Sequence, residues 1–157
     1  MQRATLNFET LLEVTNALNS QRDIDSLWRV IADQIRKVIP WDRAGITLYE
    51  SQTDSFRSYA VITNMATPAL AHDSVIPRKG SAVGWVHDNR RLHIREDLQK
   101  EQVFLEDRYY VQEGLGRMIN LPLLVREQCL GTLNIGSVQS GHLDQDGCKF
   151  LQHVATQ

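Results

Sequence analysis

The sequence predicts an α+β domain in which helices from both ends of the chain pack against one antiparallel sheet. Three observations favour this fold: helical apolar spacing within the first 38 residues, two later hairpins with alternating apolar residues, and a helical stretch at the end. Both alternating sets of residues in the hairpins include apolar side chains, so the sheet needs cover on both faces. We therefore expect the terminal helices on one face and the middle of the chain on the other.

Length and composition fit a single globular domain over residues 1–157. Of the 157 residues, 42% are hydrophobic and 23% are charged, and the formal net charge is −2. DNA-binding modules are normally basic, so this balance argues against direct nucleic-acid binding by the domain. Two cysteines indicate a reducing cytoplasm rather than a disulfide framework, and the short apolar stretches predict no membrane insertion.

Two amphipathic helices are expected at the start of the chain. Apolar residues follow the i, i+3, i+4, i+7 spacing of one helix face, first over residues 8–18 and then over residues 24–38. We expect Asp23 to cap the second helix and Pro40 to end it. The best apolar residues of the first helix form one stripe, which consists of Phe8, Leu11, Leu12 and Leu18.

Two antiparallel hairpins are predicted from period-two alternation. They pair residues 44–48 with 56–62, and residues 118–125 with 129–137. A polar run, Ser51–Asp54, forms the turn of the first hairpin. Pro122 cannot donate a hydrogen bond to a neighbouring strand, which implies an edge position or a bulge in the second hairpin.

Residues 64–116, between the hairpins, are weakly patterned. We expect short strands at Ser74–Pro77 and Leu92–Ile94 and one or two helical turns within Ser81–Asn89. Irregular segments of this length in a compact domain are often functional. The tail, Leu143–Gln157, is helical again and has neither a glycine cap nor a proline stop, so we expect this helix to continue beyond Gln157.

Three stretches, in this order along the chain, resemble those of a GAF domain, the small-molecule sensor module of bacterial signalling proteins. They are Ile24–Trp28 leading into Pro40–Ala44, then Gly80–Val86 with Arg91–Leu98, and finally Asn120–Leu123 with Leu130–Leu133. The resemblance covers nearly the whole chain. It implies a GAF-like (profilin-like) sheet of about five or six strands, with an irregular segment and a short helix covering a pocket on the face opposite the terminal helices.

Within the family, the opening helices and the first hairpin are most similar to the sensor domains of formate-hydrogenlyase-activator-type, enhancer-binding (NtrC-family) transcriptional regulators. This resemblance implies the N-terminal sensor of such an activator, with an ATPase and a DNA-binding domain beyond Gln157. GAF domains of sensor histidine kinases and of cyclic-di-nucleotide enzymes share the same pattern and stay open as alternatives. A dimerisation scaffold without a ligand is a further alternative.

The candidate ligand-binding residues come from the middle segment and the start of the second hairpin. Ligand pockets combine apolar walls with a few polar anchors. The guanidinium of Arg95 or Arg117 suits a small carboxylate, because its fork matches two oxygens. Pairing of these arginines with Asp88, Glu96 or Asp97 is the structural alternative. The full candidate set is Trp85, His93, Arg95, Phe104, Tyr109, Tyr110, Arg117 and Met118.

The sequence offers no convincing catalytic, metal or cofactor site. No two histidines have the i, i+4 spacing of a helical metal pair, and there is neither a phosphate loop nor a nucleophile elbow. Bilin-binding GAF domains and GAF-type methionine sulfoxide reductases need cysteines near the pocket, whereas Cys129 and Cys148 lie outside the middle segment. We expect a non-enzymatic domain without a cofactor, whose partner is a small-molecule effector.

A homodimer through the terminal helices is also expected. The tail helix presents Phe150, Leu151 and Val154, and the opening helix presents its own apolar stripe. Such a stripe either faces a partner helix across a two-fold axis or packs on the sheet of its own chain.

Overall fold

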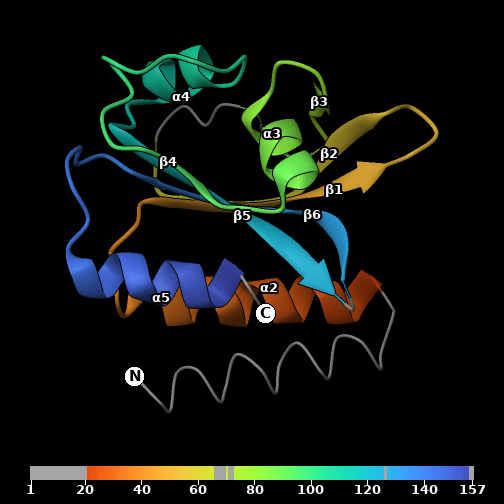
Figure 1. Cartoon of the computed structure of the whole chain (residues 1–157), viewed down its shortest axis with the longest axis horizontal. Helices are drawn as coiled ribbons and strands as arrows, with labels where there is room; N and C mark the ends of the chain where they lie inside the picture. Colours follow the sequence, from red (N-terminus) through yellow and green to blue (C-terminus); the bar gives the residue numbers. More distant parts are fainter. Residues whose placement is uncertain (1–20, 66–69, 71–72, 126, 156–157) are drawn as a thin grey trace.

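Within residues 21–65, 70, 73–125 and 127–155, which the computed structural model describes, a six-stranded antiparallel sheet separates two layers of helices (Figure 1). The strand order is β3-β2-β1-β6-β5-β4. The strands are β1 (Arg43–Glu50), β2 (Ser55–Thr63), β3 (Val75–Pro77), β4 (His93–Arg95), β5 (Arg117–Val125) and β6 (Gln128–Ser137). The helices are α2 (Gln21–Arg36), α3 (Ala82–Asn89), α4 (Asp107–Glu113) and α5 (Gln145–Ala155).

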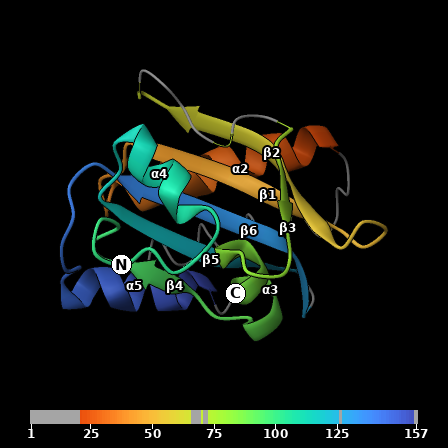
Figure 2. The ribbon, with the colours of Figure 1, turned by 90° about the horizontal axis from the view of Figure 1, so that it is seen from above.

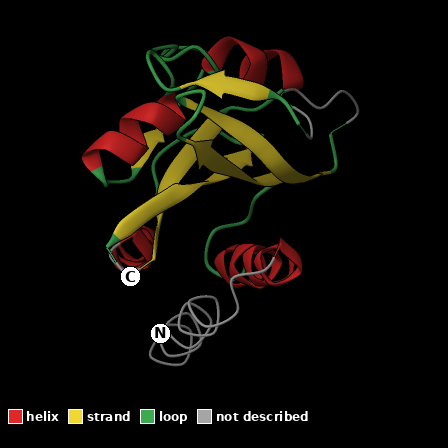
Figure 3. Cartoon of the chain, turned by 90° about the vertical axis from the view of Figure 1, so that its right-hand side faces the viewer, coloured by secondary structure: helices red, strands yellow, loops and turns green. Residues whose placement is uncertain are grey.

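The helices α2 and α5 cover one face of the sheet, and α3 and α4 lie over the other, as predicted (Figures 1 and 3). The main core lies between the sheet and α2 with α5. Its fully buried members include Trp28 and Ile35 from α2, Leu151 from α5, and Ile46 and Ile119 from the sheet. Period-two alternation explains this arrangement, because the residues between these strand positions point to the α3 and α4 side.

The two predicted hairpins are confirmed as β1–β2 and β5–β6, and both pair antiparallel. The two short strands predicted in the middle segment are confirmed as β3 and β4, which form the two edges of the sheet. Pro122 lies beyond the part of β5 that β4 covers, since β4 pairs only with Met118–Asn120. The register of β5 then shifts between Leu123 and Leu124. Because β4 does not pair with Pro122, its missing N–H costs no hydrogen bond between β4 and β5.

Two expectations need correction. The helix α2 already includes Gln21, so Asp23 lies inside it and is not its cap. The middle segment also contains the helix α4, where the sequence pattern predicts irregular chain. Gly114 ends this helix with a φ of 107°, a left-handed conformation that glycine adopts without strain. The opening stripe of residues 8–18 lies outside the described residues.

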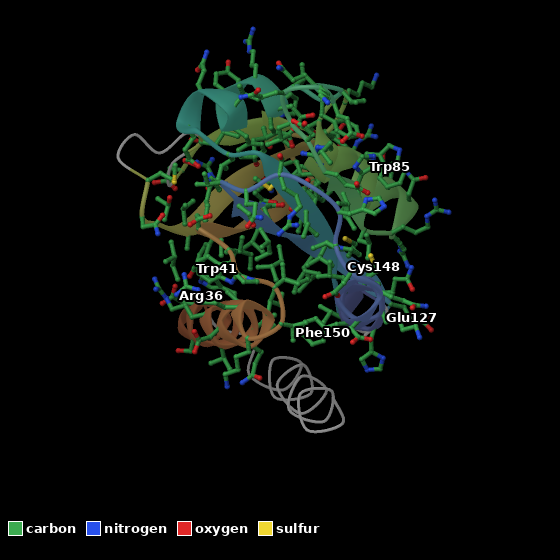
Figure 4. The ribbon with its side chains drawn as sticks, turned by 90° about the vertical axis from the view of Figure 1, so that its left-hand side faces the viewer. Arg36, Trp41, Trp85, Glu127, Cys148 and Phe150 are labelled. Atoms are coloured by element: carbon green, nitrogen blue, oxygen red, sulfur yellow. The ribbon has the colours of Figure 1, made fainter. Side chains whose placement is uncertain are left out.

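The end of α2 is fixed by Trp41. Its indole Nε1 donates a hydrogen bond to the carbonyl of Ala32 at 2.8 Å, and the guanidinium carbon of Arg36 lies 3.7 Å from the centre of its ring. Figure 4 shows Arg36 and Trp41 together at this end of the helix. These contacts hold the segment between α2 and β1 against the end of the helix. No helix in the described part of the chain has the length and apolar character needed to cross a bilayer.

Candidate functional site

A cavity of about 240 Å³ opens on the α3 and α4 side of the sheet, between β3 and α4. We call it the vestibule. Its walls are mainly apolar and include Val75 and Ile76 from the β3 side and Leu105 and Tyr109 from the α4 side. Figure 2 shows α4 over this face of the sheet, seen from above, and β3 is an edge strand of the same sheet. An apolar cavity at this place suits the body of a small molecule.

A second cavity of about 10 Å³, the chamber, lies deeper and against the sheet. Its volume is about that of one water probe, so the surrounding side chains nearly fill the chamber. Leu70 and Ile76 line both cavities, which makes them the partition between vestibule and chamber. The polar side chains that line the chamber are Arg43, Thr47, Ser58, Tyr110 and Asn134.

Buried hydrogen bonds connect four neighbouring strands beside the chamber. Thr132 Oγ1 donates to Asn134 Oδ1 at 2.9 Å, so the 2.5 Å contact between the hydroxyls of Thr47 and Thr132 must have Thr47 as its donor. The same Asn134 oxygen accepts from Asn120 Nδ2 at 2.6 Å, and Asn120 Oδ1 accepts from Arg95 Nη1 at 2.5 Å. Because each link uses a specific donor and acceptor, the network holds these side chains in one orientation.

Two buried ion pairs hold α4 on the sheet, one at each end of the helix. Arg95 Nη2 lies 2.8 Å from Asp107 Oδ1, and Arg43 Nε lies 3.1 Å from Glu113 Oε1. All four side chains are at most 3% exposed. Asp107 Oδ2 also accepts hydrogen bonds from the main-chain N–H groups of Val103 and Phe104, at 3.1 Å each, in the segment that leads into α4.

Glu106 links α4 to α3. Its carboxylate accepts hydrogen bonds from the main-chain N–H groups of Ala82 at 2.8 Å and Val83 at 3.1 Å, which begin α3. Glu106 also lines the vestibule and is only 2% exposed, and this burial raises the pKa of its carboxyl group. The start of α3 is completed by Ser81, whose Oγ accepts from the N–H of Gly84 at 3.0 Å.

Three of the sequence-predicted site residues form an aromatic cluster between α3 and β4. The ring of His93 lies edge-on to Trp85 at 5.0 Å and to Phe104 at 5.1 Å, measured between ring centres. The guanidinium carbon of Arg95 lies 5.2 Å from the centre of the Phe104 ring. Burial, and secondarily the charge of Arg95, lower the pKa of His93.

The other predicted residues are spread over the domain. Tyr109 lines the vestibule and Tyr110 lines the chamber, where burial raises the Tyr110 pKa to about 12. Met118 packs in a small apolar cluster with Tyr110 and Leu115.

Arg117 lies on the opposite face of the sheet. It shares its side of β5 with Ile119 of the main core, and its Nη1 donates to the carbonyl of Gly141 at 3.4 Å. Arg95 uses Nη1 and Nη2 on Asn120 and Asp107, not on the acids considered from the sequence. Neither guanidinium thus offers an open fork to a carboxylate in this arrangement.

Sequence reasoning missed the polar chamber. Arg43, Thr47 and Ser58 are polar residues of β1 and β2 that face the side of the sheet covered by α3 and α4. Polar side chains at such positions were the available signal, since a covered sheet face is otherwise apolar. Leu70 gave no signal, because its role depends on tertiary contacts.

Metal-ligating and nucleophilic groups do not gather around the cavities in the described part of the chain. Among those residues, no three His, Cys, Asp or Glu side chains come together. Cys129 belongs to β6, and burial raises the pKa of its thiol. Cys148 belongs to α5, on the other face of the sheet from α4 (Figure 4). His72 lies outside the described residues.

Comparison with known proteins identifies one matching family model and many solved structures with a similar fold. A family model described as GAF domain matches residues 23–157. No curated protein sequence matches the chain. The GAF domain of a two-component sensor histidine kinase from Bacillus halodurans superposes with a TM-score of 0.69 at 23% identity, covering 87% of this chain and 88% of that one.

Two further structures are similar. The GAF domain of a phosphoenolpyruvate-protein phosphotransferase from Acinetobacter has a TM-score of 0.67 at 16% identity, with 99% of this chain and 88% of that one covered. A free methionine-R-sulfoxide reductase from Neisseria meningitidis, solved with its substrate, has a TM-score of 0.66 at 14% identity, with 97% and 86% covered. Since the family model spans most of its length and the fold agrees, the chain belongs to the GAF domain family of sensory and regulatory domains.

Proposed function

We propose that this GAF domain is a non-catalytic sensor that binds a small-molecule effector in the vestibule and chamber. One observation carries the proposal: an apolar cavity of about 240 Å³ adjoins a polar chamber, and Leu70 and Ile76 line both. An apolar space beside polar side chains suits a ligand that has an apolar part and a polar part.

Effector binding would act by a shift of populations. The effector binds one arrangement of α3, α4 and β3 better than another, and this difference in affinity biases an attached output domain. The buried ion pairs at the two ends of α4 favour discrete arrangements, since an intermediate position leaves charges buried without partners.

The proposed context is the N-terminal sensor of a bacterial enhancer-binding transcriptional activator, acting in the cytoplasm. The resemblance of the opening helices and first hairpin supports it, and both cysteines being free agrees with a reducing compartment. A sensor histidine kinase is the second candidate, because two of the similar structures are domains of such kinases. Sequencing the surrounding gene would decide between the two contexts, because it shows whether an ATPase with a DNA-binding domain or a kinase is encoded with this domain.

A thermal-shift screen of small carboxylates, uncharged amides, nucleotides and metal ions tests the sensor proposal. A ligand present at about 100 times its Kd stabilises the folded state by about 2.7 kcal/mol, which raises Tm by several degrees. We expect at least one class of organic compound to do so. An unchanged Tm with every class would refute the sensor proposal in favour of the scaffold.

The absence of catalysis needs its own test, because reductases are among the similar folds. Neither Cys129 nor Cys148 lines the vestibule or the chamber. We therefore expect no consumption of free methionine sulfoxide when the protein is incubated with it and a thiol reductant. Turnover that is lost in Cys129→Ser or Cys148→Ser would contradict this expectation.

A further inference from the structure

The buried charges around the cavities are already compensated by the protein. Each buried arginine on this face is paired with an acid of α4, and the Glu106 carboxylate is bound by the N-terminus of α3. The pairs are Arg43 with Glu113 and Arg95 with Asp107. A charged group that enters the chamber would have to separate one of these pairs and leave a buried charge without its partner, which is strongly unfavourable. An uncharged ligand carries no such penalty.

The chamber already holds an uncharged acceptor, the main-chain carbonyl of Leu70. Its oxygen accepts hydrogen bonds from Arg43 Nη2 at 3.2 Å and from Ser58 Oγ at 3.4 Å. These two donors belong to β1 and β2, which pair with each other, so the sheet positions them. The Leu70 backbone has a φ of 47°, a conformation that is unfavourable for a residue with a side chain.

The surroundings of Leu70 add apolar selectivity. Its side chain packs against the cluster of Phe56, Ile76 and Val83 on one side and against the cluster of Tyr110 on the other. The adjoining vestibule has an apolar rim, where Val75 is 56% exposed and Leu105 is 50% exposed. An apolar group that enters from the rim removes this surface from water.

We propose that the site takes an uncharged small molecule in which a carbonyl oxygen adjoins an apolar group. The carbonyl oxygen replaces that of Leu70 between Arg43 and Ser58, and the apolar group fills the vestibule. This inference rests on the proposed sensor function and specifies the ligand class of the same site. It differs from the small carboxylate expected from the sequence, because the buried guanidiniums of Arg43 and Arg95 are already paired and the exposed Arg108 lines only the vestibule.

Isothermal titration calorimetry with two matched probes tests the ligand class. 4-Methylpentanamide carries one uncharged carbonyl beside an isobutyl-type chain, and 4-methylpentanoate has nearly the same shape with a carboxylate in its place. We expect the amide to bind the full chain at least about tenfold more tightly than the acid, because a carboxylate in the chamber must break an ion pair.

Two variants locate the binding. Glu113→Gln removes the charge that compensates Arg43, so we expect it to shift the preference about tenfold toward the acid. The matched control is Glu127→Gln, which changes an exposed acid in the turn before β6 and leaves the preference unchanged. Leu70→Ala removes the partition side chain, and we expect the amide to bind about tenfold more tightly, whereas Val103→Ala, at an exposed position, has no effect.

Each outcome decides the inference. Tighter binding of the acid than of the amide to the unmodified chain overturns it, as does an amide affinity that Leu70→Ala leaves unchanged. If Glu113→Gln does not fold by circular dichroism, the Leu70→Ala result decides alone. Failure of both probes to bind also overturns the inference, while a Tm shift with a charged compound in the wider screen would leave the sensor function standing.

Discussion

At the scale of single residues, the buried pair of Arg95 and Asp107 makes the clearest prediction about stability. Arg95→Met leaves the Asp107 charge buried without its partner, so we expect the free energy of unfolding to fall by about 3–5 kcal/mol. Arg57→Met breaks an ion pair whose side chains are 45% and 41% exposed, and it should change stability far less. Urea denaturation measures both, and equal effects would contradict the assigned role of burial.

His93 makes a prediction about pH. Its pKa is lower in the folded chain than the ordinary 6.5, so the unfolded chain binds protons more readily just below that pH. Stability is therefore complete above the ordinary value and is lost as the pH falls through it. We expect urea denaturation at about pH 7.5 and about pH 5.5 to show this loss, and His93→Phe to reduce it while keeping the ring contacts. Identical pH slopes for both proteins would be evidence against the burial effect.

Individual site residues were only partly predictable from the sequence. The sequence predicts Tyr109 and Tyr110 as site residues because they are aromatic and belong to the middle segment, and the structure places them in the walls of the vestibule and chamber. Arg117 was selected for its charge beside apolar residues, but the side of a strand on which it lies depends on register, which charge alone does not define. Leu70 could not be found, because its carbonyl contacts Arg43 only after β1, β2 and the loop between β2 and β3 have come together.

At the scale of elements, the packing of α3 depends on a glycine. A Cβ added at Gly84 would lie 1.8 Å from the main-chain oxygen of Arg78, so Gly84→Ala must push α3 away from the chain before it. We expect a loss of about 3 kcal/mol in the free energy of unfolding.

Gly147 in α5 provides the matched control for Gly84. A Cβ there would lie 3.1 Å from Asp144 Oδ1, which accepts a hydrogen bond from the Gly147 N–H at 2.7 Å, and its other nearest neighbours are side-chain atoms of Ile39 at 3.7 and 3.8 Å. We expect Gly147→Ala to change the free energy of unfolding by at most about 1 kcal/mol, because the gain in helix propensity offsets a small shift of this capping side chain. Thermal unfolding of both variants tests the pair, and a Gly84→Ala protein as stable as the original would show that α3 is not held as described.

The elements themselves were largely predictable, with one informative exception. The alternation of apolar residues predicts both hairpins, and short apolar runs predict β3 and β4. In these segments the local sequence pattern agrees with the side chains that are buried in the folded domain. The helix α4 has only seven residues, too few for a periodic signal to emerge. Its position depends instead on distant partners such as Arg43 and Arg95.

At the scale of the whole molecule, assembly stays a prediction. The tail residues Phe150, Leu151 and Val154 pack into the core of their own chain, so a dimer contact would rest mainly on the opening stripe of residues 8–18. We expect a dimer by light scattering at about micromolar concentration, and a monomer when Leu11→Glu and Leu18→Glu are combined, since charges disrupt an apolar helix contact. Val138→Glu, at a 51% exposed loop position, is the control. An unmodified chain that is monomeric would contradict the prediction.

The central claim is that a small molecule binds between the sheet and the α3 and α4 layer. Amide chemical-shift mapping by NMR with an organic compound that raises Tm tests this claim most directly, because it reports every element at once. The account predicts that the largest shifts occur at residues around the two cavities, including Ser58, Ile76 and Tyr109, while α2 and α5 change little. Shifts concentrated on α2 and α5, or no shifts with any compound, would contradict it.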